Sequence, residues 1–329
     1  MRYRPLGPSG IEASVIGLGT WAIGGWMWGG TDERDAVDAI QAAIDSGITL
    51  IDTAPAYGMG RSEQIVGQAI AGRRDQVVLA TKCGLVWDTN EGTPFVMQNG
   101  HQIHRYLGPE SIKRECELSL KRLGTDYIDL YQTHWQDSTT PIEETMSALL
   151  DLKSEGKIRA IGVSNATTEQ IAEYSALGPV DADQEKYSML DRNLEAVHLP
   201  FLEKHNIAFL AYSPLANGLL SGKITPRRKF SGDDLRRNNA RFTDENRQWV
   251  VKVLQEFEPI AQEHHATLAQ VVIGWTLEQP GVTHALVGAR HRNQALENAV
   301  AGDLALSADE LTEISQAIEQ FSEAGTGRR

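Results

Sequence analysis

Short apolar runs alternate with longer segments of helical spacing along most of the chain, from about residue 15 to about residue 300. Each run is rich in β-branched residues and is followed by apolar residues three or four positions apart, the pattern of a strand and then an amphipathic helix. The runs predict strands at Ser14–Leu18, Thr49–Thr53, Val77–Thr81, Ile128–Gln132, Ala160–Ser164, Ala182–Gln184, Ala208–Tyr212 and Ala285–Val287. The segments between and after them predict helices at Asp32–Ser46, Ser62–Ala71, Pro109–Leu123, Pro141–Glu155, Thr168–Leu177, Arg192–Lys204, Glu245–His265, Leu268–Gln279 and Asn293–Val300. Repeated strand–helix units indicate a parallel sheet.

Polar side chains stand at or just after the carboxyl ends of many of these strands. They are Asp52, Lys82, His134, Ser164, Gln184 and Tyr212. A closed barrel would bring these residues to one mouth, where active sites of such barrels are built, whereas an open sheet would spread them along an edge. We therefore predict an α/β fold of the (β/α)8 TIM-barrel class, with residues 1–329 forming a single domain.

Three segments do not follow the alternation of predicted strands and helices. Tyr3–Ala13 contains the turn sequence Gly7-Pro-Ser-Gly10 and predicts an N-terminal β-hairpin against the barrel floor. Trp87–Leu107 and Pro214–Thr243 predict long loops after the third and seventh strands. Loops of that length in a compact domain commonly bind ligands or cover a site.

Composition narrows the possible partners. The formal net charge of −13 argues against nucleic acid, because phosphate binding needs a basic face. The basic N-terminus has no apolar run behind it, and no stretch approaches the roughly 18 apolar residues of a membrane helix. Cys83 and Cys116 are too few for a disulfide framework and are not spaced as metal ligands. We expect a cytoplasmic protein without a metal site or membrane contact.

The most informative sequence is Leu50-Ile-Asp-Thr-Ala-Pro-Ala-Tyr-Gly58 at the second predicted strand. The third strand ends in Leu79-Ala-Thr-Lys82, and the fourth ends in Leu130-Tyr-Gln-Thr-His134. Together these segments resemble the catalytic tetrad of the aldo-keto reductase superfamily, with Asp52, Tyr57, Lys82 and His134 as its members. The resemblance continues through Gly17-Leu-Gly-Thr-Trp21, Gly162-Val-Ser-Asn165, Gln184-Glu-Lys-Tyr187, Ala211-Tyr-Ser-Pro-Leu215 and Val287-Gly-Ala-Arg290. The pattern is most similar to the bacterial general-stress and inositol-catabolism branch.

These four residue types suit carbonyl reduction, in which hydride reaches carbon while a proton must reach oxygen. Tyr57 is expected to donate that proton, and an ammonium close by, from Lys82, is expected to lower the pKa of the phenol. Asp52 would offset the buried ammonium charge. His134 would donate a hydrogen bond to the carbonyl and stabilise the developing oxyanion.

The resemblance also implies a nicotinamide cofactor along the barrel mouth. At the nicotinamide end it implicates Gly19, Thr20, Trp21, Asp52, Ser164, Asn165, Gln184 and Tyr212, whose ring would stack on the nicotinamide. Pyrophosphate contacts are implied for Ser213, Leu215, Gly218, Ser221, Lys223 and Arg228, and adenosine contacts for Gly288, Arg290, Gln294, Glu297 and Asn298. Gly17-Leu-Gly-Thr-Trp-Ala22 also matches the dinucleotide fingerprint G-x-G-x-x-A, but no helix opens there.

Cofactor preference depends on the residues at the adenosine end. In many family members a lysine and a downstream arginine hold the 2′-phosphate of NADP(H), and this chain has Gly288 and Gln294 at those places. Arg290 can still contact a phosphate. A run of arginines after Arg227 indicates a nearby anion or a solvated loop. We favour NADP(H) over NAD(H).

Aromatic residues predict the wall of the substrate pocket. Trp26, Trp28, Trp87 and Trp135 fall on or beside the expected mouth, and Trp87 and Trp135 directly follow strands. The chain ends soon after its last predicted helix, so no long C-terminal loop is expected to close the pocket, which favours small polar aldehydes over steroids. His134 agrees with this, because the steroid double-bond reductases of the superfamily have glutamate there.

We therefore expect NADPH-dependent reduction of small aldehydes and ketones. Two alternatives stay open: an alcohol or polyol dehydrogenase that runs the same reaction in reverse, and a redox-sensing regulatory protein similar to the potassium-channel β subunits. The sequence leaves the oligomeric state undetermined.

Overall fold

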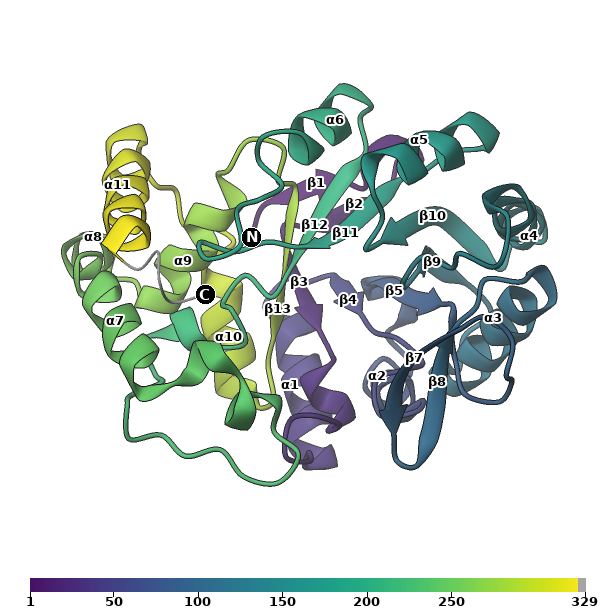
Figure 1. Cartoon of the computed structure of the whole chain (residues 1–329), viewed down its shortest axis with the longest axis horizontal. Helices are drawn as coiled ribbons and strands as arrows, with labels where there is room; N and C mark the ends of the chain where they lie inside the picture. The colour runs from purple at the N-terminus through teal and green to yellow at the C-terminus, as the bar shows by residue number, and fades with distance from the viewer. Residues whose placement is uncertain (325–329) are drawn as a thin grey trace.

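The computed structural model describes residues 1–324, and within them the eight predicted strands close into a parallel barrel (Figure 1). In order around the ring they are β3 (Ile16–Gly19), β4 (Leu50–Asp52), β5 (Val78–Cys83), β9 (Ile128–Thr133), β10 (Ile158–Ser164), β11 (Ala182–Lys186), β12 (Ala208–Tyr212) and β13 (His284–Gly288). The last strand pairs with the first, Ala285 beside Ile16. The (β/α)8 prediction is confirmed.

Helices surround the barrel and contribute most of its outer core. In the described chain they are α1 (Glu33–Asp45), α2 (Arg61–Ala69), α3 (Pro109–Leu123), α4 (Ile142–Ser154), α5 (Thr168–Leu177), α6 (His198–Lys204), α7 (Asp244–Gln255), α8 (Glu258–Glu263), α9 (Leu268–Leu277), α10 (Arg292–Val300) and α11 (Ala308–Ala324). Thr167 and Thr267 begin α5 and α9 with capping boxes that also use Gln170 and Gln270. These caps show why the two helices start where the sequence predicts.

The sixth helix is shorter than predicted. The sequence pattern indicates a helix over Arg192–Lys204, but α6 begins only at His198. Pro200 accounts for the difference, because a helix from Arg192 would place it in the interior, where it lacks an N–H and clashes with the preceding turn. From His198, the same proline falls in the first turn, which tolerates it.

The predicted helix Glu245–His265 is interrupted, and one further helix follows the last predicted one. The interruption lies between α7 and α8, where Pro259 occupies the start of α8. The additional helix is α11, whose Ile314 and Ile318 are buried in the outer core. In Figure 1, α7, α8 and α11 gather at one side of the barrel.

The N-terminal hairpin is present as β1 (Tyr3–Pro5) and β2 (Glu12–Ser14). Ser14 pairs with Tyr3 in this hairpin, so the first barrel strand begins at Ile16 rather than at Ser14. Leu6 from the connecting turn is fully buried among inward-facing barrel residues such as Leu130. The hairpin thus covers the barrel floor as predicted.

The segment Trp87–Leu107, predicted as a loop, is mostly β-structure. It holds β7 (Thr93–Gln98) and β8 (His101–Arg105), and β8 also pairs with the short strand β6 (Leu85–Val86). The strands β7 and β8 are joined by Asn99 and Gly100, both with positive φ (49° and 81°). Such a two-residue turn matches the twist of a hairpin, so the Asn-Gly pair was the signal for the strands.

The long connection after β12 is confirmed as a segment without α-helices or strands. Between Pro214 and Thr243 it contains three 3-10 turns, Leu219–Ser221, Leu235–Asn238 and Ala240–Phe242. Asp233 of this loop accepts hydrogen bonds from the backbone N–H groups of Met27 and Gly29, at 2.9 and 3.0 Å. The loop therefore meets the segment after β3 across the barrel mouth.

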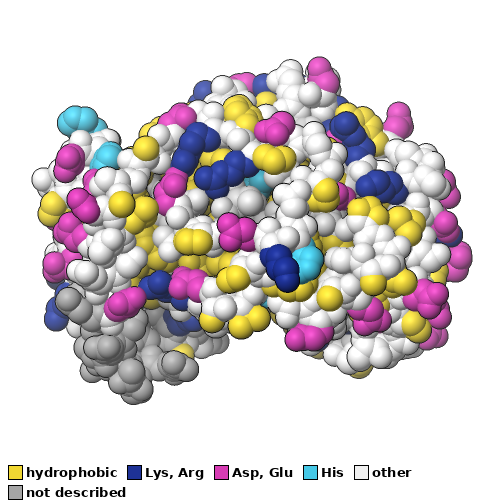
Figure 2. Space-filling view, turned by 90° about the horizontal axis from the view of Figure 1, so that it is seen from above, with side chains coloured by type: hydrophobic (Ala, Val, Ile, Leu, Met, Phe, Trp, Pro, Cys, Tyr) yellow, Lys and Arg dark blue, Asp and Glu magenta, His cyan; other side chains and the backbone are white. Residues whose placement is uncertain are grey.

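Charge on the surface is mixed. Figure 2 shows Asp and Glu side chains scattered over one face, with Lys and Arg in a few small groups between them. Within residues 1–324, no helix has the length and hydrophobicity that crossing a membrane requires.

Candidate active site

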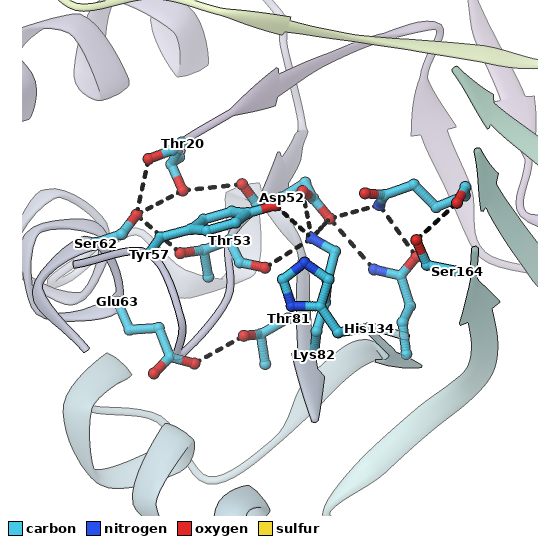
Figure 3. A network of polar contacts seen from close by, with 12 residues as sticks. Thr20, Asp52, Thr53, Tyr57, Ser62, Glu63, Thr81, Lys82, His134 and Ser164 are labelled. Atoms are coloured by element: carbon cyan, nitrogen blue, oxygen red, sulfur yellow. Dashed lines mark hydrogen bonds and ion pairs between the residues drawn. The ribbon is translucent and has the colours of Figure 1, made fainter. Parts of the chain in front are cut away.

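Asp52, Tyr57 and Lys82 form one hydrogen-bonded group at the carboxyl ends of β4 and β5 (Figure 3). The Lys82 Nζ donates to both carboxylate oxygens of Asp52, at 2.9 and 2.7 Å, and to the Thr53 carbonyl oxygen at 3.0 Å. The same Nζ lies 3.3 Å from the Tyr57 hydroxyl oxygen. The lysine therefore connects a carboxylate on one strand with a phenol on the loop that follows it.

The barrel places these residues near the carboxyl ends of adjacent strands. Asp52 lies beside Ala80 on the neighbouring strand, and Lys82 lies beside Gln132 on the next. His134 follows β9 directly, and its ring meets the Tyr57 ring edge-on, with centroids 5.6 Å apart. The four residues of the predicted tetrad are thus neighbours in space.

Burial is the largest cause of the pKa shifts of Tyr57 and Lys82. It raises the pKa of Tyr57 well above its ordinary value of 10, and the Asp52 carboxylate raises it further. Burial also lowers the pKa of Lys82, although Asp52 opposes that shift. The expectation of a lowered pKa for the phenol is wrong, because burial and then the Asp52 carboxylate raise it. Tyr57 consequently holds its proton throughout the neutral range.

His134 is neutral in this environment. Burial, and then the Lys82 charge, lower its pKa well below the ordinary value of 6.5. A neutral imidazole still carries one N–H donor. His134 can therefore donate a hydrogen bond to a carbonyl oxygen without adding charge to the site.

We expect the single-turnover rate of aldehyde reduction to be flat between about pH 6.5 and about pH 9.5. Tyr57 is the expected proton donor, and its protonated fraction falls only as the pH approaches its pKa, which lies above 10. In the reverse direction the phenolate is the expected base, so alcohol oxidation should accelerate about tenfold per pH unit over the same range. Stopped-flow cofactor absorbance in both directions measures this, with circular dichroism as the folding control. A reduction rate that halves between pH 7 and pH 9 would contradict it.

Two glutamines also donate hydrogen bonds to the Asp52 carboxylate. Gln184 Nε2 donates to Asp52 Oδ1 at 2.8 Å, and Gln132 Nε2 donates to the same oxygen at 3.2 Å. Gln184 also donates to Gln132 Oε1 at 3.2 Å. The sequence interpretation included Gln184 but missed Gln132. Its signal was its position near the carboxyl end of β9, two residues before His134, among the strand-end polar residues.

Helix α2 ties the site together from the other side. Ser62 Oγ donates to the Thr20 carbonyl oxygen at 3.0 Å and to the Thr20 hydroxyl at 2.7 Å, and accepts from Thr53 at 3.0 Å (Figure 3). Glu63, fully buried, accepts from the Thr81 hydroxyl at 2.7 Å and from Arg122 at 2.6 Å. These contacts fix β3, β4 and β5 against one helix. The contacts of Ser62 and Glu63 were not predicted, because serine and glutamate are common in the first turn of any helix and do not by themselves indicate a buried contact.

Asn165 sits in a tight turn after β10, with φ at 53°. Its Nδ2 donates to the His134 carbonyl oxygen at 2.9 Å and to Ser164 Oγ at 3.0 Å, while Tyr212 donates to its Oδ1 at 3.0 Å. The turn is anchored from outside the barrel by Glu185, which accepts from the Ala166 N–H at 2.8 Å. The turn therefore joins three of the predicted cofactor residues to the tetrad.

Glu185 belongs to a group on the outer face of β11 that also contains Asp183 and His198. His198 Nε2 and Asp183 Oδ2 are 2.7 Å apart, and burial raises the pKa of Glu185 to about 9. One potential ligand atom from each residue lies within 4.8 Å of the others. Asp183 Oδ1 is buried without a hydrogen-bond partner, and Glu185 connects this group to the Asn165 turn through the Ala166 N–H.

A cavity of about 700 Å³ opens above the tetrad. Its wall includes the predicted cofactor residues Gly19, Thr20, Trp21, Asp52, Ser164, Asn165, Gln184, Tyr212, Ser213, Leu215, Gly218, Ser221, Lys223, Arg228, Gly288, Arg290, Gln294, Glu297 and Asn298. Tyr57, His134, Trp26 and Trp135 line it as well, whereas Lys82 is fully buried behind them. The structure therefore brings the predicted residues into one space of a size common for ligand sites.

The prediction that Trp87 lines the pocket is wrong. Trp87 packs against the cluster of Ala56, Leu85 and Ile103 instead of lining the cavity. The reason is the β7–β8 hairpin, whose Phe95 and Val96 form this part of the wall. Sequence reasoning missed both residues because it treated the segment as a loop.

The far part of the cavity has donors and acceptors that fit a dinucleotide. Lys223 pairs with Glu297 Oε2, while Glu297 Oε1 is buried without a partner and could accept from an amino group. Arg290 donates to the carbonyl oxygens of Trp28 (3.1 Å) and Gly30, and Gln294 accepts from the Arg290 N–H at 2.8 Å. Arg236, from the run of arginines after Arg227, also lines this part. The end of the cavity beside the tetrad is polar and suits a nicotinamide ring. The other end holds basic side chains, which suit the phosphates of the cofactor.

Comparison with known proteins agrees with this geometry. The model described as the aldo/keto reductase family matches residues 15–319. The chain is 46% identical over 297 residues to aldo-keto reductase YhdN of Bacillus subtilis (strain 168), covering 89% of this chain and 86% of that protein. It is 43% identical over 329 residues to the NADH-specific methylglyoxal reductase of Escherichia coli (strain K12), covering 97% and 100%. Among solved structures, the glycerol dehydrogenase AKR11B4 from Gluconobacter oxydans matches with a TM-score of 0.87 and 38% identity, covering 97% of this chain and 95% of that one.

Proposed function

The chain belongs to the aldo/keto reductase family, whose members are NAD(P)H-dependent oxidoreductases, and on that premise we propose that it reduces small aldehydes and ketones with Tyr57 as the general acid. The observation that carries the proposal is the position of the Lys82 Nζ, which lies 2.7 Å from Asp52 and 3.3 Å from the Tyr57 hydroxyl oxygen. The phenol group stands at the inner wall of a cavity that is large enough for a cofactor and a small substrate.

The cofactor, when bound, supplies the hydride. Tyr57 holds a proton at its phenolic oxygen and transfers it to the carbonyl oxygen as that atom gains charge. Lys82 and Asp52 position the phenol, and the ammonium stabilises the phenolate that is left after proton transfer. His134 donates a hydrogen bond to the same carbonyl oxygen, so two donors converge on the developing alkoxide.

Small polar carbonyl compounds are the proposed substrates. The wall near the tetrad combines the aromatic rings of Trp26, Phe95 and Trp135 with the polar groups of Tyr57 and His134. Initial rates of NADPH and NADH oxidation with methylglyoxal and glyceraldehyde test this function. Binding of NADPH without turnover of any carbonyl compound would instead indicate a redox-sensing regulatory protein.

We also propose that NADP(H) is preferred over NAD(H). Arg228, Arg236 and Arg290 line the cavity, and the carboxylate of Glu297 is offset by Lys223. An arginine fork suits a 2′-phosphate. Because one relative is named NADH-specific, both cofactors have to be measured side by side.

Arg290→Gln should raise the KM for NADPH about tenfold or more and change the KM for NADH much less, because only NADPH carries the 2′-phosphate. The matched control is Arg292→Gln, two residues later, where the arginine pairs with Asp38 and does not line the cavity. Steady-state kinetics at saturating aldehyde give both constants. If the KM rises equally for the two cofactors, Arg290 holds the loop at Gly30 in place and does not contact the 2′-phosphate.

Alcohol oxidation is a second candidate, favoured by the match to a structure named as a glycerol dehydrogenase. The same residues serve in reverse, with the Tyr57 phenolate as base. Rates with glycerol and NADP+ at pH 9, compared with the reduction of glyceraldehyde, decide between the directions. We further propose a cytoplasmic location, which is supported by two free, buried cysteines.

A further inference from the structure

Asp183, Glu185 and His198 form a polar group that is separate from the cavity above the tetrad. Asp183 and Glu185 alternate with Gln184 along β11, so they face out of the barrel while Gln184 faces inward to Asp52. His198 is the first residue of α6, and its Nε2 lies 2.7 Å from Asp183 Oδ2. None of the three residues lines the cavity. The group therefore lies behind the active site, on the opposite face of the same strand.

The two carboxyl groups are withdrawn from water and have no basic side chain beside them. Asp183 is 0% exposed and His198 is 7% exposed, while Glu185 is partly exposed. Within residues 1–324, neither carboxyl group forms an ion pair with a lysine or an arginine, whereas the buried Glu63 pairs with Arg122. Neighbouring carboxylates that lose their hydration repel each other, so a positive charge between them is strongly favoured.

One carboxylate oxygen of this group accepts no hydrogen bond. Asp183 Oδ2 contacts His198, but Asp183 Oδ1 is buried without a hydrogen-bond partner. Both oxygens belong to one carboxyl group, so the open acceptor stands within the cluster itself. A buried acceptor without a donor costs free energy, and buried carboxylates are generally paired or coordinate a metal ion. The open oxygen therefore indicates a cation as the ligand of the group.

An imidazole with two carboxylates suits a transition-metal ion such as Zn²⁺. Zn²⁺ binds histidine nitrogen and carboxylate oxygen at about 2.0–2.2 Å in a tetrahedron, which places its ligand atoms about 3.4 Å apart. One ligand atom from each of the three residues lies within 4.8 Å of the others, so small side-chain movements reach that spacing. Mg²⁺ and Ca²⁺ prefer oxygen ligands alone. The partial exposure of Glu185 gives the ion a path from solvent and leaves its fourth position to water.

We propose that Asp183, Glu185 and His198 bind one divalent transition-metal ion of the Zn²⁺ class in a structural site on the outer face of β11. The site does not depend on the proposed reductase function. It departs from the expectation of no metal site, which considered only the spacing of the two cysteines. The ion ties the start of α6 to β11 and, through the 2.8 Å contact of Glu185 with the Ala166 N–H, to the turn at Asn165.

Titration of the full chain with ZnCl₂ tests this site. The protein is stripped with EDTA, freed of the chelator and titrated by calorimetry at about pH 7.5, where we expect one ion per chain with a Kd of about 10 µM or lower. Saturating Zn²⁺ should raise the Tm by about 3 °C or more, because an ion that binds only the folded state stabilises it. CoCl₂ should give the visible absorption of tetrahedral Co²⁺, and MgCl₂ should neither bind nor raise the Tm.

Three variants locate the bound ion. Asp183→Asn and His198→Gln each remove one ligand atom and should weaken Zn²⁺ binding at least about 100-fold. Asp183 is fully buried, so Glu185→Gln is measured beside it as a variant at a partly exposed position. Its amide oxygen can still accept from the Ala166 N–H, but the carboxylate ligand is lost, and Zn²⁺ binding should weaken to a similar extent.

His264→Gln is the matched control. His264 Nε2 lies 2.6 Å from Glu310 Oε1, so this pair also joins an imidazole to a carboxylate, but no third ligand group accompanies it among the described residues. This variant should bind Zn²⁺ as the wild type does. Equal Zn²⁺ affinity in the wild type and in all three ligand variants would place the ion elsewhere and overturn the site. A wild type that binds no Zn²⁺ at about 100 µM would also overturn it and identify the group as a carboxyl pair that shares a proton.

Discussion

Tyr57→Phe is expected to lower kcat/KM for aldehyde reduction by about 10³-fold or more, at the upper end of what a general acid contributes. The substitution removes only the hydroxyl group. The ring contacts with Trp21, at a centroid distance of 6.3 Å, and with His134, at 5.6 Å, would remain. Lys82 would keep both bonds to Asp52. Loss of rate can therefore be attributed to the missing proton rather than to a changed site.

Three measurements separate chemistry from structure in this variant. The melting temperature and the Kd for NADPH should stay at wild-type values, while the single-turnover rate falls. Tyr127→Phe is the matched control, because Tyr127 lies before β9, where its ring packs against Arg74 at 3.9 Å, away from the cavity. A Tyr57→Phe enzyme that retains a tenth of wild-type activity would move the role of acid to His134 or water.

Lys82→Met should reduce kcat/KM by about 10²- to 10³-fold and also destabilise the fold by about 3–5 kcal/mol. Lys82 and Asp52 are both buried, at 0% and 3% side-chain exposure. Removing the ammonium leaves a buried carboxylate whose remaining side-chain hydrogen-bond donors, among the described residues, are Gln132 and Gln184. That uncompensated charge also makes the phenolate of Tyr57 less favourable, because Asp52 already raises the pKa of the phenol.

The double variant Lys82→Met, Asp52→Asn distinguishes the two effects. It removes both charges, so most of the lost stability should return, measured as the free energy of unfolding in urea. Activity should stay low, because the group that stabilises the phenolate is still absent. Recovery of activity together with stability would show that Lys82 acts on the fold alone.

The difference between sequence and structure is clearest in the β7–β8 hairpin. Its strands carry few aliphatic residues and only three of their eleven residues are buried, so the apolar pattern that marked the barrel strands is weak there. The Asn99–Gly100 turn was a local signal for the hairpin. Which of its residues reach the cavity could not be read from it, because that depends on how the hairpin packs over Ala56 and Leu85.

The sequence by itself determined the barrel and the placement of the tetrad. Both follow from local rules: a strand–helix rhythm closes into a parallel barrel, and residues at the carboxyl ends of its strands share one mouth. For this reason Asp52, Lys82 and His134 could be grouped at one mouth before any coordinates were known, whereas Tyr57 and most of the cofactor residues were implied by the resemblance to the aldo-keto reductases.

The tertiary structure decided what depends on contacts across the barrel and on burial. Gln132 meets Gln184 and Asp52 only because closure and register bring three strands to one point. The pKa of Tyr57 rises rather than falls because burial disfavours the phenolate, and depth in a fold is not written in a motif. Trp87 lies outside the cavity wall for the same reason, because packing between distant segments fixes the position of each side chain.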